Sequence, residues 1–143
     1  MRLWHKKLIP YMPGLQLKGQ WRECALIARA IKENGTPNHL LVNRVLDYPY
    51  CEFESYCDIV QTEMKKRGYR ILQKGYDQIH GDRKEVYFGN ILKDWHNTEY
   101  LRVCMANLYE KHHFGIGKSR ITDEEWQVLL DGYKTITGED YVI

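Results

Sequence analysis

The chain has 143 residues, 43% hydrophobic and 28% charged, which is the size and composition of one globular domain. Its formal charge of +2 does not identify nucleic acid as the partner, because enzymes of small acidic metabolites have similar charges. No apolar run approaches the roughly 18 residues that cross a bilayer, and the first residues lack the apolar core of a signal peptide. We therefore expect a cytoplasmic protein that does not contact a membrane.

The opening segment, residues 1–14, alternates apolar and basic residues and contains two prolines. Proline disfavours a regular helix, so this pattern predicts an extended arm that leads into the first helix. We expect the arm to pack across the core through Leu3, Trp4 and Leu8. Such packing would also hold the first residues in place.

Residues 15–34 form the first predicted helix. Its apolar residues recur at alternating gaps of four and three, which lines one helical face for burial. The residues of this face are Leu17, Trp21, Cys24, Ala28 and Ile31. A turn over residues 33–38 follows, and the mixed periodicity of residues 39–46 fits either a short helix or a strand, of which we expect the helix.

The second half of the chain predicts three more long helices and one irregular stretch. A helix over residues 50–67 has basic residues in its last turn and Gly68 at its C-cap, so the helix dipole explains its Lys65-Lys66-Arg67 run. Residues 69–96 lack a sustained period and predict irregular structure with a short turn at 87–92.

Two capping signals mark the remaining helices. Asn97 or Thr98 caps a helix that runs to about His113, and Thr122 with Glu125 forms a capping box for a helix that ends before Gly138. No repeat or linker is present. The sequence thus predicts a single, compact, mostly α domain over residues 1–143, with three or four helices joined by long loops.

The cysteines and histidines do not form a metal-binding pattern. No two cysteines are separated by two residues, as zinc sites require, and the neighbours His112 and His113 cannot both face one metal from a helix. We therefore expect buried thiols, no metal and no cofactor. The cysteines are Cys24, Cys51, Cys57 and Cys104.

Arg22 and Glu23 on the first helix form a candidate site. Helical side chains lean toward the N-terminus, so the Glu23 carboxylate is expected above Gly19, which has no side chain to cover it. A carboxylate beside an arginine, above an open floor, suits an active site. The alternative is an ordinary surface pair on an amphipathic helix.

The N-terminal amine is a second candidate. Methionine aminopeptidases act before small residues, so the bulky Arg2 is expected to leave Met1 in place. α-Amino groups in general have a pKa of about 7.7 to 8.0, well below that of lysine, so a neutral and nucleophilic fraction exists near neutral pH. An anchored arm would present this amine at a fixed position.

The start Met-Arg-Leu-Trp-His, followed by Gln16-Leu17 and Trp21-Arg22-Glu23, resembles the pyrimidine-dimer DNA glycosylase family, which has phage and bacterial members. Weaker similarities are present at residues 63–69 and 107–111. The resemblance implies a compact α-helical fold and a bifunctional glycosylase and abasic-site lyase. It implies that the Met1 α-amine forms an imine at C1′ of a damaged nucleotide, with Glu23 assisting bond cleavage and Arg22 beside it.

The same resemblance implies double-stranded damaged DNA as the partner, and we expect a monomer. The expected DNA contacts are Arg2, His5, Gln16, Lys18 and Arg29. Trp4 or Trp21 could stack on or wedge into the duplex, although the helical pattern favours a place in the core for each.

Departures from the family pattern concern substrate recognition. The phage member carries an N-terminal threonine, a histidine at the position of Gln16 and a basic residue at that of Leu26, and its aromatic C-terminal segment has no counterpart here beyond residues 132–134. The lesion is therefore open between a pyrimidine dimer and an abasic site. Two other classes stay open as well: a non-catalytic nucleic-acid-binding module of the same fold, and an enzyme of small acidic substrates.

Overall fold

The computed structural model describes residues 1–85, 87 and 89–143, and within them every regular element is helical. The α-helices are α1 (Gly14–Asn34), α2 (Tyr50–Lys66), α3 (Gln73–His80), α4 (Thr98–His113) and α5 (Asp123–Thr137). Three short 3-10 helices accompany them: η1 (Lys6–Tyr11), η2 (Asn43–Asp47) and η3 (Gly117–Ser119). The predicted mostly α fold is confirmed. None of the described helices is long and apolar enough to cross a bilayer.

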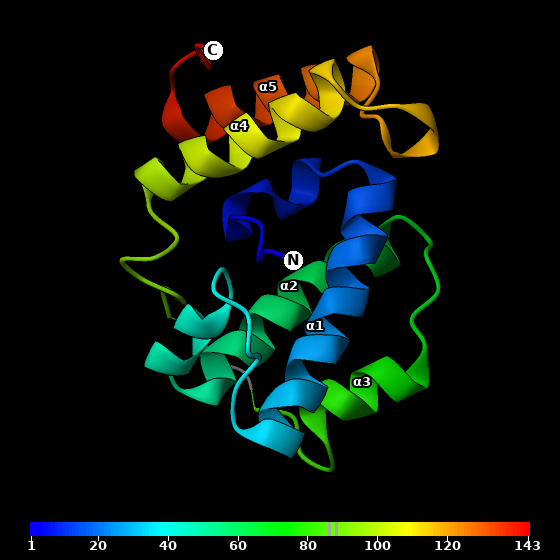
Figure 1. Ribbon diagram of the computed structural model, residues 1–143, viewed down its shortest axis with the longest axis vertical. Helices are drawn as coiled ribbons and strands as arrows, with labels where there is room; N and C mark the ends of the chain where they lie inside the picture. The colour runs from blue at the N-terminus through cyan, green and yellow to red at the C-terminus, as the bar shows by residue number, and fades with distance from the viewer. Residues whose placement is uncertain (86, 88) are drawn as a thin grey trace.

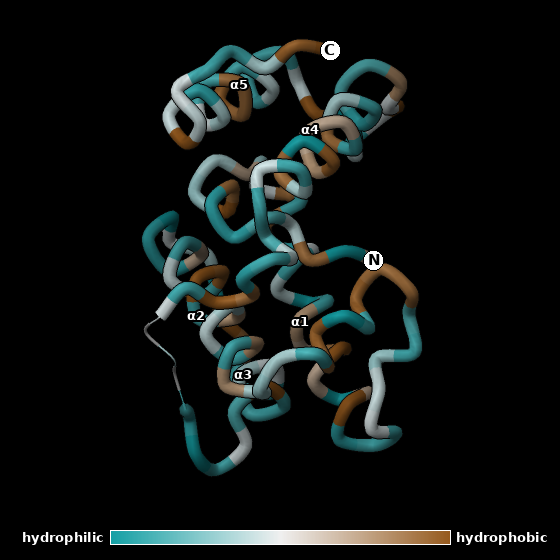
Figure 2. The backbone as a smooth tube through the Cα atoms, turned by 90° about the vertical axis from the view of Figure 1, so that its left-hand side faces the viewer, coloured by the Kyte–Doolittle hydropathy of each residue, from teal (hydrophilic) through white to brown (hydrophobic). Residues whose placement is uncertain are grey.

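The helices form two layers with the N-terminal segment between them. Figure 1 shows α4 and α5 side by side at one end and α1, α2 and α3 at the other, and Figure 2 shows the same separation from the side. The first residues and η1 occupy the middle, where η1 packs against both α2 and α5. Leu3, Leu8 and Ile9 are completely buried there. The N-terminal segment is therefore part of the core that joins the two layers.

The predicted helix ends agree with the structure to within one residue because local residues cap them. The exception in detail is α2, where Arg67 and not Gly68 is the C-cap. α1 ends at Gly35, whose φ of +76° is a left-handed conformation that glycine adopts without strain. The Asn97 side chain accepts a hydrogen bond from the Tyr100 N–H at the start of α4. At the start of α5, Thr122 and Glu125 form the predicted capping box.

The N-terminal arm is more compact than predicted. Leu3, Trp4 and Leu8 are buried as expected, but the expectation of an extended arm was wrong for residues 6–11, which form η1. The physical reason is local: His5 Nδ1 accepts a hydrogen bond from the Lys7 N–H at 3.1 Å and caps the turn.

Helix α3 corrects the expectation of irregular structure over residues 69–96. α3 has only eight residues and buries only Ile79 and His80, so its hydrophobic period is too short to recognise. Gly75 faces α1, and a Cβ there would lie 3.5 Å from the indole nitrogen of Trp21, which is an ordinary packing contact. The turn predicted at 87–92 includes Phe88, which lies outside the described residues.

The prediction of a short helix over residues 39–46 was partly right. Residues 39–46 were expected to form a helix, and the structure has a turn followed by the 3-10 helix η2, Asn43–Asp47. The thiols of Cys24, Cys57 and Cys104 are buried as predicted. Burial is the main cause that raises the pKa of the Cys104 thiol to about 11, so this thiol stays protonated at neutral pH.

Candidate active site

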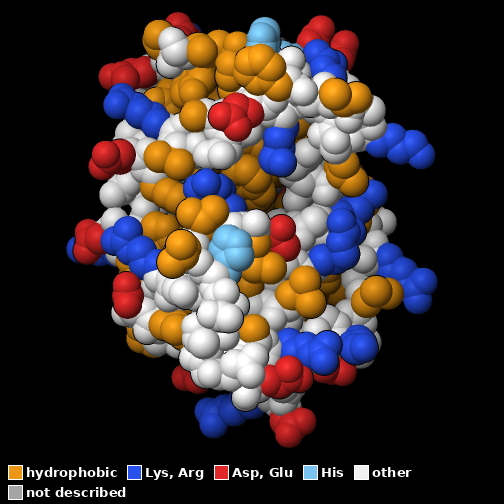
Figure 3. All heavy atoms as spheres, viewed as in Figure 1, with side chains coloured by type: hydrophobic (Ala, Val, Ile, Leu, Met, Phe, Trp, Pro, Cys, Tyr) orange, Lys and Arg blue, Asp and Glu red, His pale blue; other side chains and the backbone are white. Residues whose placement is uncertain are grey.

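The N-terminus emerges at the centre of one face of the molecule. The N label in Figure 1 lies between the two layers of helices, and Figure 3 shows a hollow in the same part of the surface. Met1 is 41% exposed, although Leu3, two residues later, is completely buried. The anchored Leu3 and Trp4 therefore hold the first residue at the surface and leave its amine accessible.

Gln20 on α1 fixes the N-terminal backbone. This side chain is only 1% exposed, and its Oε1 accepts a hydrogen bond from the Trp4 N–H at 2.7 Å. Its Nε2 donates to the Arg2 carbonyl at 3.0 Å and to the Glu23 carboxylate at 3.3 Å. One buried amide thus connects the residue after Met1 with the candidate carboxylate.

Two tyrosine hydroxyls complete the anchorage from the other helices. Tyr56 on α2 donates to the Trp4 carbonyl at 2.6 Å and lies 3.0 Å from Gln20 Oε1. Tyr100 on α4 donates to the Leu3 carbonyl at 2.6 Å. Burial raises the pKa of both tyrosines above the ordinary value, so each stays a neutral donor. Helices from both layers therefore hold this short segment.

Glu23 lies half-buried on α1, and Arg22 beside it is exposed. The open floor above Gly19 is present: a Cβ on Gly19 would have only the Arg22 guanidinium nearby, at 3.8 Å. Among the ion pairs of the described residues, none joins Glu23 to Met1 or to Arg22. The Gln20 hydrogen bond orients the Glu23 carboxylate, which has further acceptor positions beyond this contact.

The cationic candidates differ in how firmly they are held. The Arg2 guanidinium lies 5.9 Å from the ring centre of Trp4 and 6.0 Å from that of Tyr100. Lys18 Nζ lies 4.6 Å above the Tyr69 ring. Arg29 pairs with Glu33 at 3.0 Å, and both side chains are exposed. Aromatic faces therefore orient Arg2 and Lys18, while the Arg29 pair is open to solvent and weak.

His5 and Gln16, the other expected DNA contacts, differ in exposure. Gln16 is half-buried near the start of α1. His5 is only 2% exposed and faces His96, with ring centres 5.2 Å apart. Burial lowers the pKa of His5 to about 4 and that of His96 to about 2, so both rings are neutral at physiological pH. A neutral, buried His5 offers no exposed surface to a phosphate, so His5 is not among the proposed DNA contacts.

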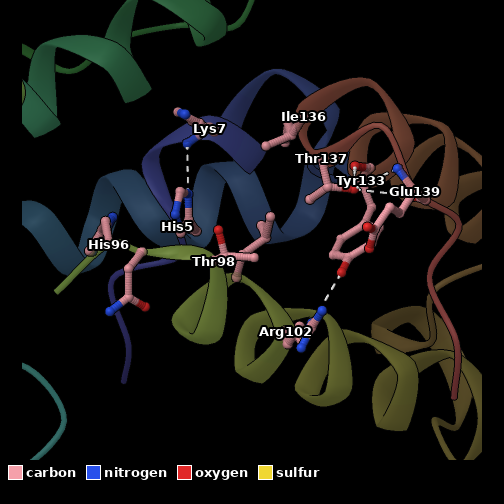
Figure 4. Close-up of a pocket in the computed structure, with 11 residues that line it drawn as sticks. His5, Lys7, His96, Thr98, Arg102, Tyr133, Ile136, Thr137 and Glu139 are labelled. Atoms are coloured by element: carbon pink, nitrogen blue, oxygen red, sulfur yellow. Dashed lines mark hydrogen bonds between the residues drawn. The ribbon is translucent and has the colours of Figure 1, made fainter. Parts of the chain in front are cut away.

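A cavity of about 400 Å³ lies between η1, α4 and α5 (Figure 4), and neither Met1 nor Glu23 is among its lining residues. Arg102 Nε donates to the Tyr133 hydroxyl at 3.3 Å across one wall. The main polar lining residues are His5, Lys7, His96, Arg102, Tyr133 and Glu139. Among the described residues, no group of three or more His, Cys, Asp or Glu side chains could hold a metal ion.

Gln20, Tyr56 and Tyr100 were not predicted as parts of this site. Glutamine is usually exposed, so the burial of Gln20 was not expected. A clue was available: Gln20 is polar yet lies directly before Trp21 at the edge of the apolar face. Trp4 and Trp21 are themselves buried, so neither is available as a wedge.

Comparison with known proteins gives one match. A family model described as pyrimidine dimer DNA glycosylase matches residues 1–76 of the 143. The matched part includes η1, α1, α2 and the start of α3, and thus contains Met1, Gln20 and Glu23. No significant match was found among curated proteins or among solved structures.

Proposed function

Because the chain belongs to the pyrimidine dimer DNA glycosylase family, we propose that it repairs DNA by attacking a damaged nucleotide with the α-amine of Met1. The family implies an enzyme with a DNA substrate. The proposed activity combines removal of a base, from a pyrimidine dimer or another damaged nucleotide, with cleavage of the strand at the resulting abasic site. The same amine also forms an imine with the sugar of a pre-existing abasic site, where no base has to leave.

The proposed reaction has two stages. The neutral amine adds to C1′ while the bond from C1′ to the base breaks, and the base leaves with a proton. The C1′–O4′ bond of the sugar ring then opens, O4′ takes up a proton from the nitrogen, and the C=N double bond that forms is an imine between the protein and the sugar. A base then removes a proton from C2′, and the bond from C3′ to its phosphate oxygen breaks by β-elimination. We assign these proton transfers, including removal of the C2′ proton, to the carboxylate of Glu23, which Gln20 links to the N-terminal backbone.

The observation that carries this proposal is the Gln20 amide. It donates one hydrogen bond to the Arg2 carbonyl and another to the Glu23 carboxylate, at 3.0 and 3.3 Å. The proposed nucleophile, the Met1 amine, is one residue before the Arg2 carbonyl that Gln20 contacts. The Gln20 amide therefore fixes the position of the Met1 amine relative to the Glu23 carboxylate. Positioning of this kind supplies a large part of catalysis, because a displacement of about 1 Å can cost roughly 100-fold in rate.

The proposed DNA contacts lie on α1 and at the start of the chain. Arg22 and Lys18 are exposed on α1, and Arg2 is half-buried at the start of the chain. Arginine and lysine bind phosphates and fix the register of a protein on a duplex without reading sequence. We assign Arg2, Arg22 and Lys18 to the phosphates next to the lesion. Gln16, near the start of α1, and Arg29, near its end, are assigned to more distant DNA contacts.

Borohydride trapping tests the proposal, because borohydride reduces an imine to a stable covalent link. The substrates are duplexes that carry an abasic site or a cyclobutane pyrimidine dimer. Protein with its native N-terminus, checked by intact mass to begin at Met1, is compared with protein extended by several residues. The proposal predicts an adduct that disappears on extension, and the preferred duplex identifies the lesion. DNA binding without an adduct on either duplex would favour a non-catalytic binding module instead.

A further inference from the structure

A turn between α1 and η2 carries two exposed leucines at its tip. We call residues 36–42 the leucine turn. Leu40 is 93% exposed and Leu41 47% exposed, whereas the next residue, Val42, is completely buried. Figure 2 shows the hydrophobic colour at this tip. A single exposed leucine is common on protein surfaces and needs no function. A function for Leu40 must therefore be argued from the rigidity of the turn and from its position in the molecule.

Backbone hydrogen bonds make the leucine turn rigid. The His39 N–H donates to the Asn43 side chain at 2.9 Å. The His39 carbonyl accepts from the N–H groups of Val42 and Asn43 at 3.0 and 2.8 Å. Asn38 has a φ of +54°, a left-handed conformation that asparagine tolerates better than most residues. The turn therefore holds Leu40 on a fixed support whose base is anchored by Val42.

The tip of the leucine turn lies beside the N-terminus. In Figure 1 the cyan chain rises from the end of α1 to the level of the N label, and in Figure 2, turned by 90°, the brown tip again lies next to it. Figure 3 shows hydrophobic side chains and Lys and Arg side chains together around the central hollow. The candidate amine thus lies on a face that carries both apolar and cationic side chains.

We infer that Leu40 enters the base stack of damaged duplex DNA and fills the space that the extruded nucleotide leaves. This inference rests on the proposed function. A nucleotide inside a duplex must leave the stack before its C1′ can reach the Met1 amine. Apolar side chains inserted between base steps unstack them and kink the duplex, and leucine is one of the residues that proteins use for this.

Charge favours a duplex over another protein as the occupant of this surface. The Lys and Arg side chains around the hollow complement phosphates, while the apolar tip complements stacked bases. Leu40 also loses little on insertion, because a side chain that is 93% exposed makes almost no contact within the folded chain. Its burial between bases removes apolar surface from water at no expense to the protein core.

Single-turnover trapping of Leu40→Ala tests this role with one oligonucleotide in two forms. The substrate is a strand that carries an abasic site, either single-stranded or paired in a duplex. Only the duplex must be opened, so the variant is expected to trap the duplex at least tenfold more slowly, about 1.4 kcal/mol in the barrier, and the single strand at the wild-type rate. Leu40→Met should restore most of the duplex rate, and Leu46→Ala, at a leucine 45% exposed on η2, is the matched control.

A fluorescent base reports the insertion itself. With 2-aminopurine next to the abasic site, wild-type binding should raise the emission by unstacking the base, and Leu40→Ala should not. Equal loss of rate on both substrates, or no loss on either, would overturn the inference. Absence of any adduct with the wild-type protein would instead refute the proposed function, so the two failures are distinguishable. Folding should not change, because substitutions at exposed positions are usually within about 0.5 kcal/mol.

Discussion

Replacement of Gln20 by methionine removes the amide that connects the N-terminus to Glu23 while keeping most of the side-chain volume. The variant loses the acceptor for the Trp4 N–H and both donor contacts, to Arg2 and to Glu23. The Trp4 N–H becomes a buried, unpaired donor, which costs about 1 to 3 kcal/mol. The Tyr56 hydroxyl keeps its bond to the Trp4 carbonyl, so the loss is limited to this amount.

For a chain of this size the expected decrease in melting temperature is roughly 3 to 9 °C, because each kcal/mol corresponds to about 3 °C. Circular dichroism during heating measures it. Trapping of an abasic duplex at saturating protein should slow by at least tenfold at a temperature where the variant is fully folded, since Met1 and Glu23 are then no longer held in register.

Gln61→Met is the matched control for this substitution. Gln61 is also a buried glutamine, but its Oε1 has no hydrogen-bond partner among the described residues. Its replacement should therefore leave stability nearly unchanged and the trapping rate at the wild-type value. If Gln20→Met were as stable and as fast as the wild type, or if both variants behaved alike, the positioning role of Gln20 would be refuted.

Three further predictions concern the carboxylate, the histidines and the helix contacts. Glu23→Gln should abolish strand cleavage and keep both the melting temperature and DNA affinity; a large loss of stability would instead indicate a structural carboxylate. Burial lowers the pKa of His5 to about 4 and of His96 to about 2, so below about pH 6.5 the unfolded chain binds protons that the folded chain does not. The free energy of unfolding should then decrease on acidification toward these pKa values, by up to roughly 1.4 kcal/mol per pH unit for each ring. Urea titrations at a series of pH values measure this, and His5→Asn should make the decrease with pH less steep. An unchanged dependence on pH in this variant would contradict the buried, neutral state of His5. Gly75→Ala in α3 should raise the free energy of unfolding by about 0.5 to 1 kcal/mol, because the new Cβ makes ordinary contacts and helical glycine is unfavourable, whereas Gly132→Ala should lower it, because its Cβ would meet a tyrosine ring at 2.4 Å; the reverse order would refute this account of the packing.

The sequence predicted the long helices because each one combines a sustained hydrophobic period with a local end signal. Thr122 with Glu125, and Asn97, are examples in which the cap is a short-range event that neighbouring residues determine. Helix α3 lacks this information. Its eight residues depend on contact with α1 through Gly75, and contacts between distant segments are not visible in local periodicity.

The candidate site was predictable only in part for a similar reason. Met1, Arg22 and Glu23 were predicted as candidates from a family pattern and from helical spacing. Tyr100 was not, because it is far away in the sequence and reaches the Leu3 carbonyl only after the two layers pack. The surface role expected for His5 illustrates the converse: its charge state depends on burial beside His96, which the sequence does not reveal.

The central claim is that the Met1 α-amine is the nucleophile, and mapping of the trapped adduct tests it most directly. After borohydride reduction with an abasic duplex, digestion by a glutamate-specific protease should release residues 1–23, which end at Glu23. Mass spectrometry should place the sugar remnant on the α-nitrogen of Met1 in this peptide. A remnant on a lysine side chain, in this peptide or in any other, would contradict the account.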